Sequence, residues 1–86
     1  MGFLQRPRWY GAPVELGEFF ILHRDRHAAR CVIRTHQFGW ELWLHVGAQA
    51  ELIQTQVCRT EEDVLTTGER WKAGMMEKGW QSAARQ

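Results

Sequence analysis

The side chains of this chain that could ligate a metal or act as a general base include its four histidines, His23, His27, His36 and His45. His23 and His27 flank an expected turn and could approach each other. His36 and His45 belong to a strand pair on which their expected positions lie about four residues apart, too far for one ion to bind both. We therefore expect ordinary polar histidines, with no metal site and no cofactor.

Carboxylates suggest general acid–base chemistry in two places, and each has a plainer interpretation. Glu61, Glu62 and Asp63 stand together, but they follow Thr60 at an expected helix start, where acidic side chains stabilise the helix dipole. His36 is expected opposite Glu41, as a base with an orienting acid or as an ordinary cross-strand polar pair. Because glycine-rich phosphate loops, paired-cysteine motifs and nucleophile elbows are also absent, we expect no catalytic residue and no enzyme.

Basic and aromatic side chains form the more suggestive group. Residues 23–36 carry four arginines against one aspartate, although the net charge of the whole chain is only +1. The strand pattern places Arg34 opposite Trp43, a spacing that predicts a cation–π stack. The candidate binding surface comprises Arg30, Val32, Arg34, Trp43 and His45.

The elements that must position this surface are strands, because apolar residues recur with a period of two. The pattern predicts strands over 17–24, 28–36, 40–46 and 51–59, with turns at 25–26, 38–39 and 47–50. A two-residue turn at 38–39 sets Ile33 opposite Leu44, and a four-residue turn at 47–50 sets Ile53 opposite Leu44 and Val57 opposite Trp40. This register places three side chains of the last strand, Leu52, Gln54 and Gln56, beside the candidate surface.

A helix follows the last strand, and both of its ends are marked in the sequence. Thr60 can cap the first turn, and Gly79 is a natural left-handed stop. Between them Val64, Gly68, Trp71 and Met75 recur on one face at helical spacing, and Trp80 can fold back on the last turn. The predicted fold class is α+β: an antiparallel β-meander of three to four strands with one C-terminal α-helix packed on one face.

The size and composition favour one small domain. The chain has 86 residues, is 44% hydrophobic and contains five tryptophans. We expect an irregular N-terminal arm over 1–16, a single domain over 17–80 and a disordered tail over 81–86. No apolar run reaches the length of a membrane span, and no signal peptide is evident. The meander should keep Cys31 and Cys58 apart and unbonded, as is usual in the cytoplasm, where we expect the protein.

Two segments, residues 38–44 and residues 56–80, resemble short bacterial proteins of an alphaproteobacterial type. The shared pattern runs from Gly39-Trp40-Glu41-Leu42 through Gln56-Val57-Cys58-Arg59 to Glu77-Lys78-Gly79-Trp80. The resemblance extends over about residues 18–80 and leaves the arm outside. It implies a single cytoplasmic bacterial domain, and since that group has no known activity it implies no catalytic residue.

These expectations favour a small non-enzymatic protein-interaction module. An apolar face that the helix does not cover rarely stays bare, so the N-terminal arm, a second copy in a homodimer, or an unknown protein should cover it. An edge strand offers another route to self-association. The alternative is single-stranded nucleic-acid binding through Arg30, Arg34 and Trp43, which the modest net charge disfavours. We expect no membrane partner.

Overall fold

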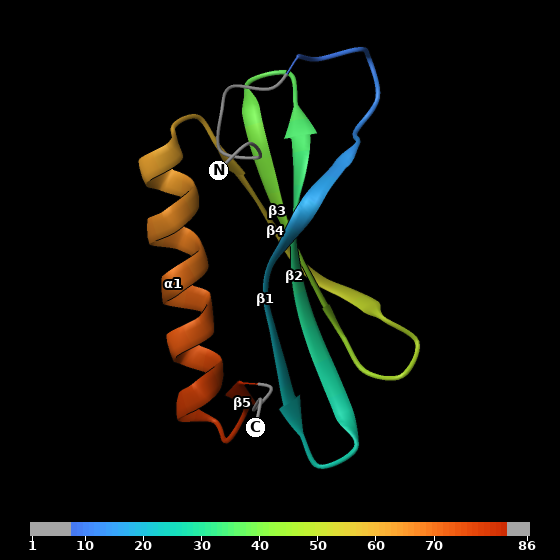
Figure 1. Cartoon of the computed structure of the whole chain (residues 1–86), viewed down its shortest axis with the longest axis vertical. Helices are drawn as coiled ribbons and strands as arrows, with labels where there is room; N and C mark the ends of the chain where they lie inside the picture. The colour runs from blue at the N-terminus through green and yellow to red at the C-terminus, as the bar shows by residue number, and fades with distance from the viewer. Residues whose placement is uncertain (1–7, 83–86) are drawn as a thin grey trace.

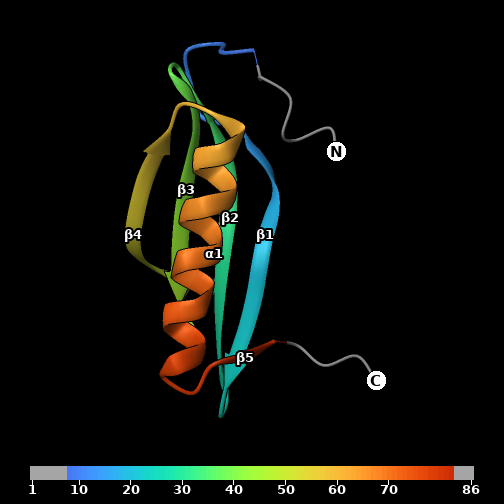
Figure 2. The same cartoon turned by 90° about the vertical axis from the view of Figure 1, so that its left-hand side faces the viewer.

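A five-stranded antiparallel sheet and one helix make up the described structure, a computed structural model that describes residues 8–82. The elements are β1 (Glu15–Arg24), β2 (His27–His36), β3 (Gly39–Val46), β4 (Glu51–Cys58), α1 (Glu61–Glu77) and β5 (Gln81–Ser82). The strand order is β4-β3-β2-β1-β5, and α1 crosses one face of the sheet (Figures 1 and 2). The predicted α+β meander with a C-terminal helix is therefore confirmed.

The β2–β3 hairpin turns one residue earlier than predicted. His36 pairs with Gly39 across the turn, so Ile33 lies opposite Leu42 and not opposite Leu44. Gly39 is not a turn residue: it opens β3 with φ 139°, and a Cβ there would lie 2.7 Å from the carbonyl oxygen of Cys58. The glycine allows close approach to β4. Because the register error is two residues, each β2 and β3 side chain still lies on its predicted face.

The β3–β4 hairpin contains an irregularity that the pattern did not reveal. Leu44 pairs with Gln54, but the next residue, His45, pairs with Leu52. Ile53 is therefore the extra residue of a β-bulge, and its side chain is 54% exposed. One inserted residue reverses the alternation along the rest of β4.

The predicted register of β4 is consequently wrong. Cys58, and not Val57, lies opposite Trp40, and Cys58 is 1% exposed. Gln54 and Gln56 lie on the face that α1 covers rather than on the candidate surface. Thr55 and Val57 take their place there.

The ends of the domain differ from expectation at both termini. Glu15 and Leu16 already belong to β1, so the irregular segment is shorter than predicted; residues 1–7 lie outside the described residues. Gln81 and Ser82 form β5, which pairs with His23 and Leu22, where a disordered tail was expected. Residues 83–86 also lie outside the described part.

The core lies between α1 and the sheet, on the predicted face. Its buried side chains come from every strand except β5, from α1 and from Trp80, three residues beyond the helix: Phe20, Leu22, Ala29, Cys31, Ile33, Trp40, Leu42, Leu44, Cys58, Val64 and Trp80. Trp71 and Met75 pack against this cluster from α1. The predicted apolar stripe of the helix is therefore confirmed.

Both ends of α1 are capped as predicted. The hydroxyl of Thr60 accepts a hydrogen bond from the backbone N–H of Asp63 at 3.0 Å. At the other end Gly79 has φ 99°, and the N–H of Trp80 reaches back to the carbonyl of Met75 at 3.2 Å. This hydrogen bond satisfies a carbonyl at the helix end that has no partner within the helix. It also places the Trp80 ring in the core, where Trp80 is 6% exposed.

Arg24, at the end of β1, attaches the sheet to this helix end. Its guanidinium lies 5.0 Å from the centre of the Trp80 ring, and Nη1 donates to the carbonyl of Lys78 at 2.9 Å. A cation at a helix C-terminus interacts favourably with the dipole. The last turn of α1, the end of β1 and β5 are thereby held together.

Gly68 sets how closely α1 approaches the sheet. It is buried, and a Cβ at this position would overlap the ring of Phe19 on β1. Gly74, two turns later, has open space where its Cβ would be. A side chain therefore has no room at Gly68, whereas no packing constraint explains Gly74.

These two glycines provide a matched test. Gly68→Ala should lower the free energy of unfolding by about 1–3 kcal/mol, because the displaced Phe19 ring outweighs the gain in helix propensity. Gly74→Ala should raise it by about 0.5–1 kcal/mol, since only helix propensity changes. Urea unfolding followed by tryptophan fluorescence measures both. A Gly68→Ala variant as stable as Gly74→Ala would contradict the close contact.

Candidate functional site

The five predicted surface residues do lie together, on the face of the sheet opposite α1. Arg30 pairs with His45 and Val32 pairs with Trp43 across the β2–β3 hairpin, and Arg34 follows on the same side of β2. Within residues 8–82 no helix or strand covers this face (Figure 1). We call it the uncovered face, comprising Ile21, Arg30, Val32, Arg34, Glu41, Trp43, His45, Leu52, Thr55 and Val57 with the acidic Glu15 and Glu18.

The predicted cation–π stack is present at the centre of this face. The guanidinium carbon of Arg34 lies 4.3 Å from the centre of the Trp43 ring. The two residues are diagonal neighbours, since Glu41 pairs with Arg34 and Val32 with Trp43. Long side chains reach a diagonal neighbour, so the contact survives the two-residue error in register. Val32, which pairs with Trp43, is only 1% exposed.

Two hydrogen-bond donors of this stack have no acceptor among residues 8–82. Nε of Arg34 and Nε1 of Trp43 are buried and unpartnered. A buried donor without an acceptor costs about 1–3 kcal/mol, whereas the same donor facing water would be satisfied. The stack therefore carries the cost of two unsatisfied donors. An acceptor that reached them by rearranging the stack would remove this cost.

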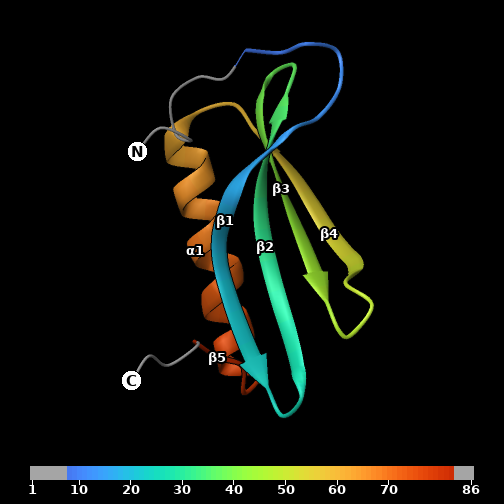
Figure 3. The same cartoon turned by 45° about the vertical axis from the view of Figure 1, so that its right-hand side comes forward.

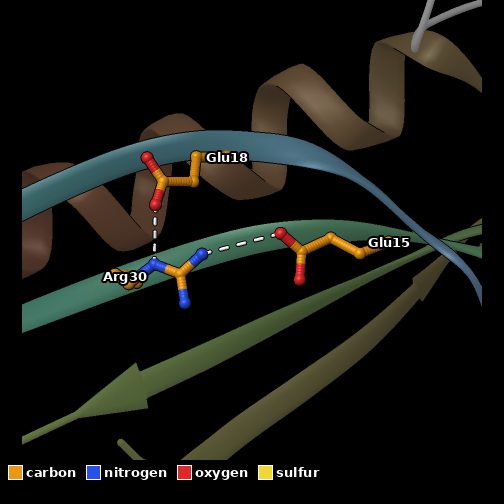
Figure 4. Close-up of polar contacts among 3 residues, drawn as sticks. All are labelled: Glu15, Glu18 and Arg30. Atoms are coloured by element: carbon orange, nitrogen blue, oxygen red, sulfur yellow. Dashed lines mark hydrogen bonds and ion pairs between the residues drawn. The ribbon is translucent and has the colours of Figure 1, made fainter.

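Arg30 is committed to carboxylates of the same chain. Its Nε lies 2.6 Å from Oε2 of Glu18 and its Nη2 lies 3.5 Å from Oε2 of Glu15 (Figure 4). Both glutamates come from β1, a strand for which the sequence pattern predicts no register. The only sequence signal for the contact was an acidic pair near the start of an otherwise apolar strand. Its consequence is that Arg30 is not a free positive charge.

His45 is held by the turn that follows its strand. Nδ1 lies 3.1 Å from the carbonyl oxygen of Ala50, so this nitrogen carries the proton and donates. The imidazole also lies 6.0 Å from the Trp43 ring, tilted by 40°. His45 therefore supports the aromatic centre from one side and helps fix the β3–β4 turn.

Apolar side chains flank the central stack on both sides. Ile21 of β1 and Val57 of β4 are half-buried, and Leu52 of β4 is 44% exposed. Val57 takes a place on this face because of the bulge, so the sequence pattern missed it. The result is a band of apolar groups across four strands, centred on Trp43.

The residues considered for acid–base or thiol chemistry do not converge. His36 pairs with Gly39, and its Nδ1 accepts from the N–H of Phe38 at 3.1 Å. Glu41 lies beside Arg34, and Cys58 lies on the other face of the sheet. Among residues 8–82 no group of three or more histidine, cysteine, aspartate or glutamate side chains could hold a metal ion.

Both thiols are buried and free, as predicted for the disulfide state. Burial, with a smaller contribution from the nearby Cys58 thiol, raises the pKa of Cys31 to about 12. Burial also raises the pKa of Cys58, and a hydrogen bond with Thr67 partly opposes this rise. Neither side chain is a thiolate near neutral pH, which removes both from nucleophilic chemistry.

We expect neither cysteine to react with iodoacetamide at pH 8 in the native protein, and both to react in urea; mass spectrometry counts the alkyl groups. The raised pKa also has a stability consequence. Unfolded thiols ionise near their usual pKa, so the native state loses stability as pH rises from about 9 towards 12. Cys31→Ala should reduce this alkaline loss. Rapid native alkylation of Cys31 would contradict its burial.

Comparison of the chain with protein-family models, with curated proteins and with solved structures gives no match. The resemblance to short bacterial proteins therefore stays a prediction, and no residue receives a role from a relative. Among residues 8–82, no helix is long and apolar enough to cross a lipid bilayer.

Proposed function

We propose that this chain is a non-enzymatic protein-interaction module that associates with a second copy of itself through the uncovered face. The observation that carries the proposal is the Arg34–Trp43 stack, with its 4.3 Å separation, at the centre of a sheet face that no described element covers. Tryptophan and arginine are the side chains most enriched at the energetic centres of protein interfaces.

The apolar band around the stack supports association rather than a bare surface. Ile21, Val57 and Leu52 retain exposed area beside Trp43. Each Å² of apolar surface removed from water contributes about 25 cal/mol, so covering such a band stabilises a complex. Packing a second sheet face against it is the arrangement found in β-sandwiches.

The charges on this face suit a partner of the same kind. Glu15, Glu18 and Glu41 stand beside Arg30 and Arg34, so acidic and basic groups are interspersed. A two-fold interface brings a surface patch against itself. A patch with both signs can then meet opposite charges, whereas a uniformly basic patch would repel its copy.

Trp43→Ala tests this interface. It should raise the dimer dissociation constant by about 10- to 100-fold, because it removes the aromatic centre. Light scattering across a concentration series measures the mass, and far-ultraviolet circular dichroism checks that the fold is kept. Leu65→Ala is the control, since Leu65 is an exposed apolar side chain on α1, 43% exposed and away from the uncovered face. A dimer that Trp43→Ala leaves intact would remove the uncovered face as the interface.

The second candidate, single-stranded nucleic-acid binding, retains one favourable observation. Arg34 over Trp43 presents an aromatic ring and a cation together, as stacking surfaces do. Against it, Arg30 is already paired with two carboxylates and Glu41 lies next to Arg34. The acidic groups repel phosphates at the same site, so self-association is the better-supported function.

Fluorescence anisotropy with labelled single-stranded oligonucleotides separates these candidates. We expect no binding at low salt, because the glutamates offset the arginines of the face. Nucleic-acid binding would instead show an affinity that falls steeply as salt rises. Such binding, abolished by Trp43→Ala, would favour the second candidate over the first.

A further inference from the structure

Arg34 and Glu41 are the charged side chains of the uncovered face that form no ion pair within residues 8–82. They are direct cross-strand partners on β2 and β3, and both are half-buried. The guanidinium of Arg34 turns to the diagonal neighbour instead and lies 4.3 Å from the centre of the Trp43 ring. The face therefore carries one cation and one anion side by side, each available to a charge from outside the chain.

Arg34 lacks a hydrogen-bond acceptor as well as a counter-charge. Its Nε is buried and has no acceptor within the described part of the chain. A guanidinium is a planar fork of donors and a carboxylate supplies only acceptors, so the two groups suit each other. Because the guanidinium already lies on an aromatic ring, it has less freedom to lose when a carboxylate binds. The group that suits Arg34 is therefore a carboxylate of a partner.

Cross-strand pairing arranges the residues of the uncovered face in rows that run across the sheet. Figure 3 shows β1, β2, β3 and β4 side by side, with α1 on the far side of the sheet. The central pairs of successive rows are Arg34 with Glu41, Val32 with Trp43, and Arg30 with His45. In the first of these rows the β2 member is a cation and the β3 member an anion.

A two-fold axis that runs along the strands, between β2 and β3, matches these rows to each other. A second copy packed face to face about this axis places each β2 residue over the β3 residue of the same row. Arg34 of each copy then meets Glu41 of the other, and Val32 meets Trp43. Further out in the sheet Ile21 meets Leu52, because these residues end one row on β1 and β4. The strands of the two sheets stay roughly aligned, as they do in β-sandwiches.

A two-fold axis that runs across the strands is the alternative, and it matches the charges poorly. It exchanges rows along the strands, so Arg34 of one copy lies over Arg30 of the other, and Glu41 lies over His45. The two unpaired charges of each copy would then be covered without an opposite charge. Like charges brought together across an interface disfavour that pairing. The charge distribution therefore favours the axis along the strands.

We propose that Arg34 of each copy pairs with Glu41 of a second copy across a two-fold axis between β2 and β3, and that this reciprocal ion pair sets the register of the self-associated form. The inference rests on the proposed function, because it names the contacts by which the uncovered face recognises its own copy. A partner must carry an anion and a cation in the same arrangement, and a second copy does. A surface that lacks either charge leaves one charge of this chain unpaired, which gives specificity.

The experiment reverses the two charges and measures the dimer dissociation constant by sedimentation. Arg34→Glu and Glu41→Arg are made singly and together, and the two single variants are also mixed in equal amounts. Each single variant should weaken its own homodimer by about tenfold or more, because like charges then face each other twice. Glu69→Arg is the control: it makes the same change of charge at an exposed position of α1 and should leave the dissociation constant unchanged. Circular dichroism checks that each variant keeps the fold.

The mixture separates a pair between copies from an interaction within one chain. In a heterodimer of Arg34→Glu with Glu41→Arg, the two new charges face each other and the two native charges face each other. This heterodimer should be about tenfold tighter than either variant homodimer, and native mass spectrometry identifies it by its mass. The double variant should also regain affinity. An interaction confined to one chain predicts recovery in the double variant but none in the mixture.

Failure of the ion pair and failure of the proposed function give different results. A wild-type chain that stays monomeric at every concentration overturns both. A wild-type dimer that Trp43→Ala dissociates, but that neither charge reversal weakens, overturns the ion pair alone. A mixture that forms no heterodimer also overturns the ion pair. If a charge reversal does not fold, Glu41→Gln, which keeps the size of the side chain, replaces it, and an unchanged dissociation constant overturns the pair.

Discussion

The contact between Gly68 and the ring of Phe19 is the constraint from which the rest of the structure follows. With no side chain at position 68, α1 lies directly against β1, and a Cβ there would overlap the ring. This approach brings Trp71 and Met75 onto the core cluster. It also lets Trp80 and Arg24 close the far end of the helix against the sheet. In so small a chain one such helix must supply the whole second layer.

The strand pattern could predict which side of β2 and β3 faces the helix, because parity alone decides it. The turn before Gly39 was misplaced since glycine usually indicates a turn, whereas here it relieves a contact with the Cys58 carbonyl. That error preserved parity, so each β2 and β3 side chain still lies on its predicted face. The bulge at Ile53 did not preserve parity, so Cys58 lies in the core where Val57 was predicted. No residue type near Ile53 indicates an inserted residue. Local sequence patterns predict the alternation of side chains between the two faces of a strand, but they do not predict an inserted residue.

The residues of the candidate surface also differ in how well the sequence predicted them, according to the strand on which they lie. The five predicted surface residues lie on β2 and β3, the two strands whose parity was predicted correctly: Arg30, Val32, Arg34, Trp43 and His45. The sequence pattern therefore placed them on one face correctly. Glu15 and Glu18 were missed because β1 is apolar on both faces and carries two irregularities in register. They change the charge of the surface, since both carboxylates pair with Arg30 and its guanidinium is not a free cation. A surface that looked basic in the sequence is in fact balanced.

Within residues 8–82, a single helix against a four-strand meander leaves two features that no other element covers. One is the face behind the helix, where two donors of the Arg34–Trp43 stack lack acceptors. The other is the β4 edge, beyond which no described strand lies. A larger domain would cover both with further elements. The proposed self-association would cover the face with a second copy of the chain, because its interspersed charges suit a patch that meets itself.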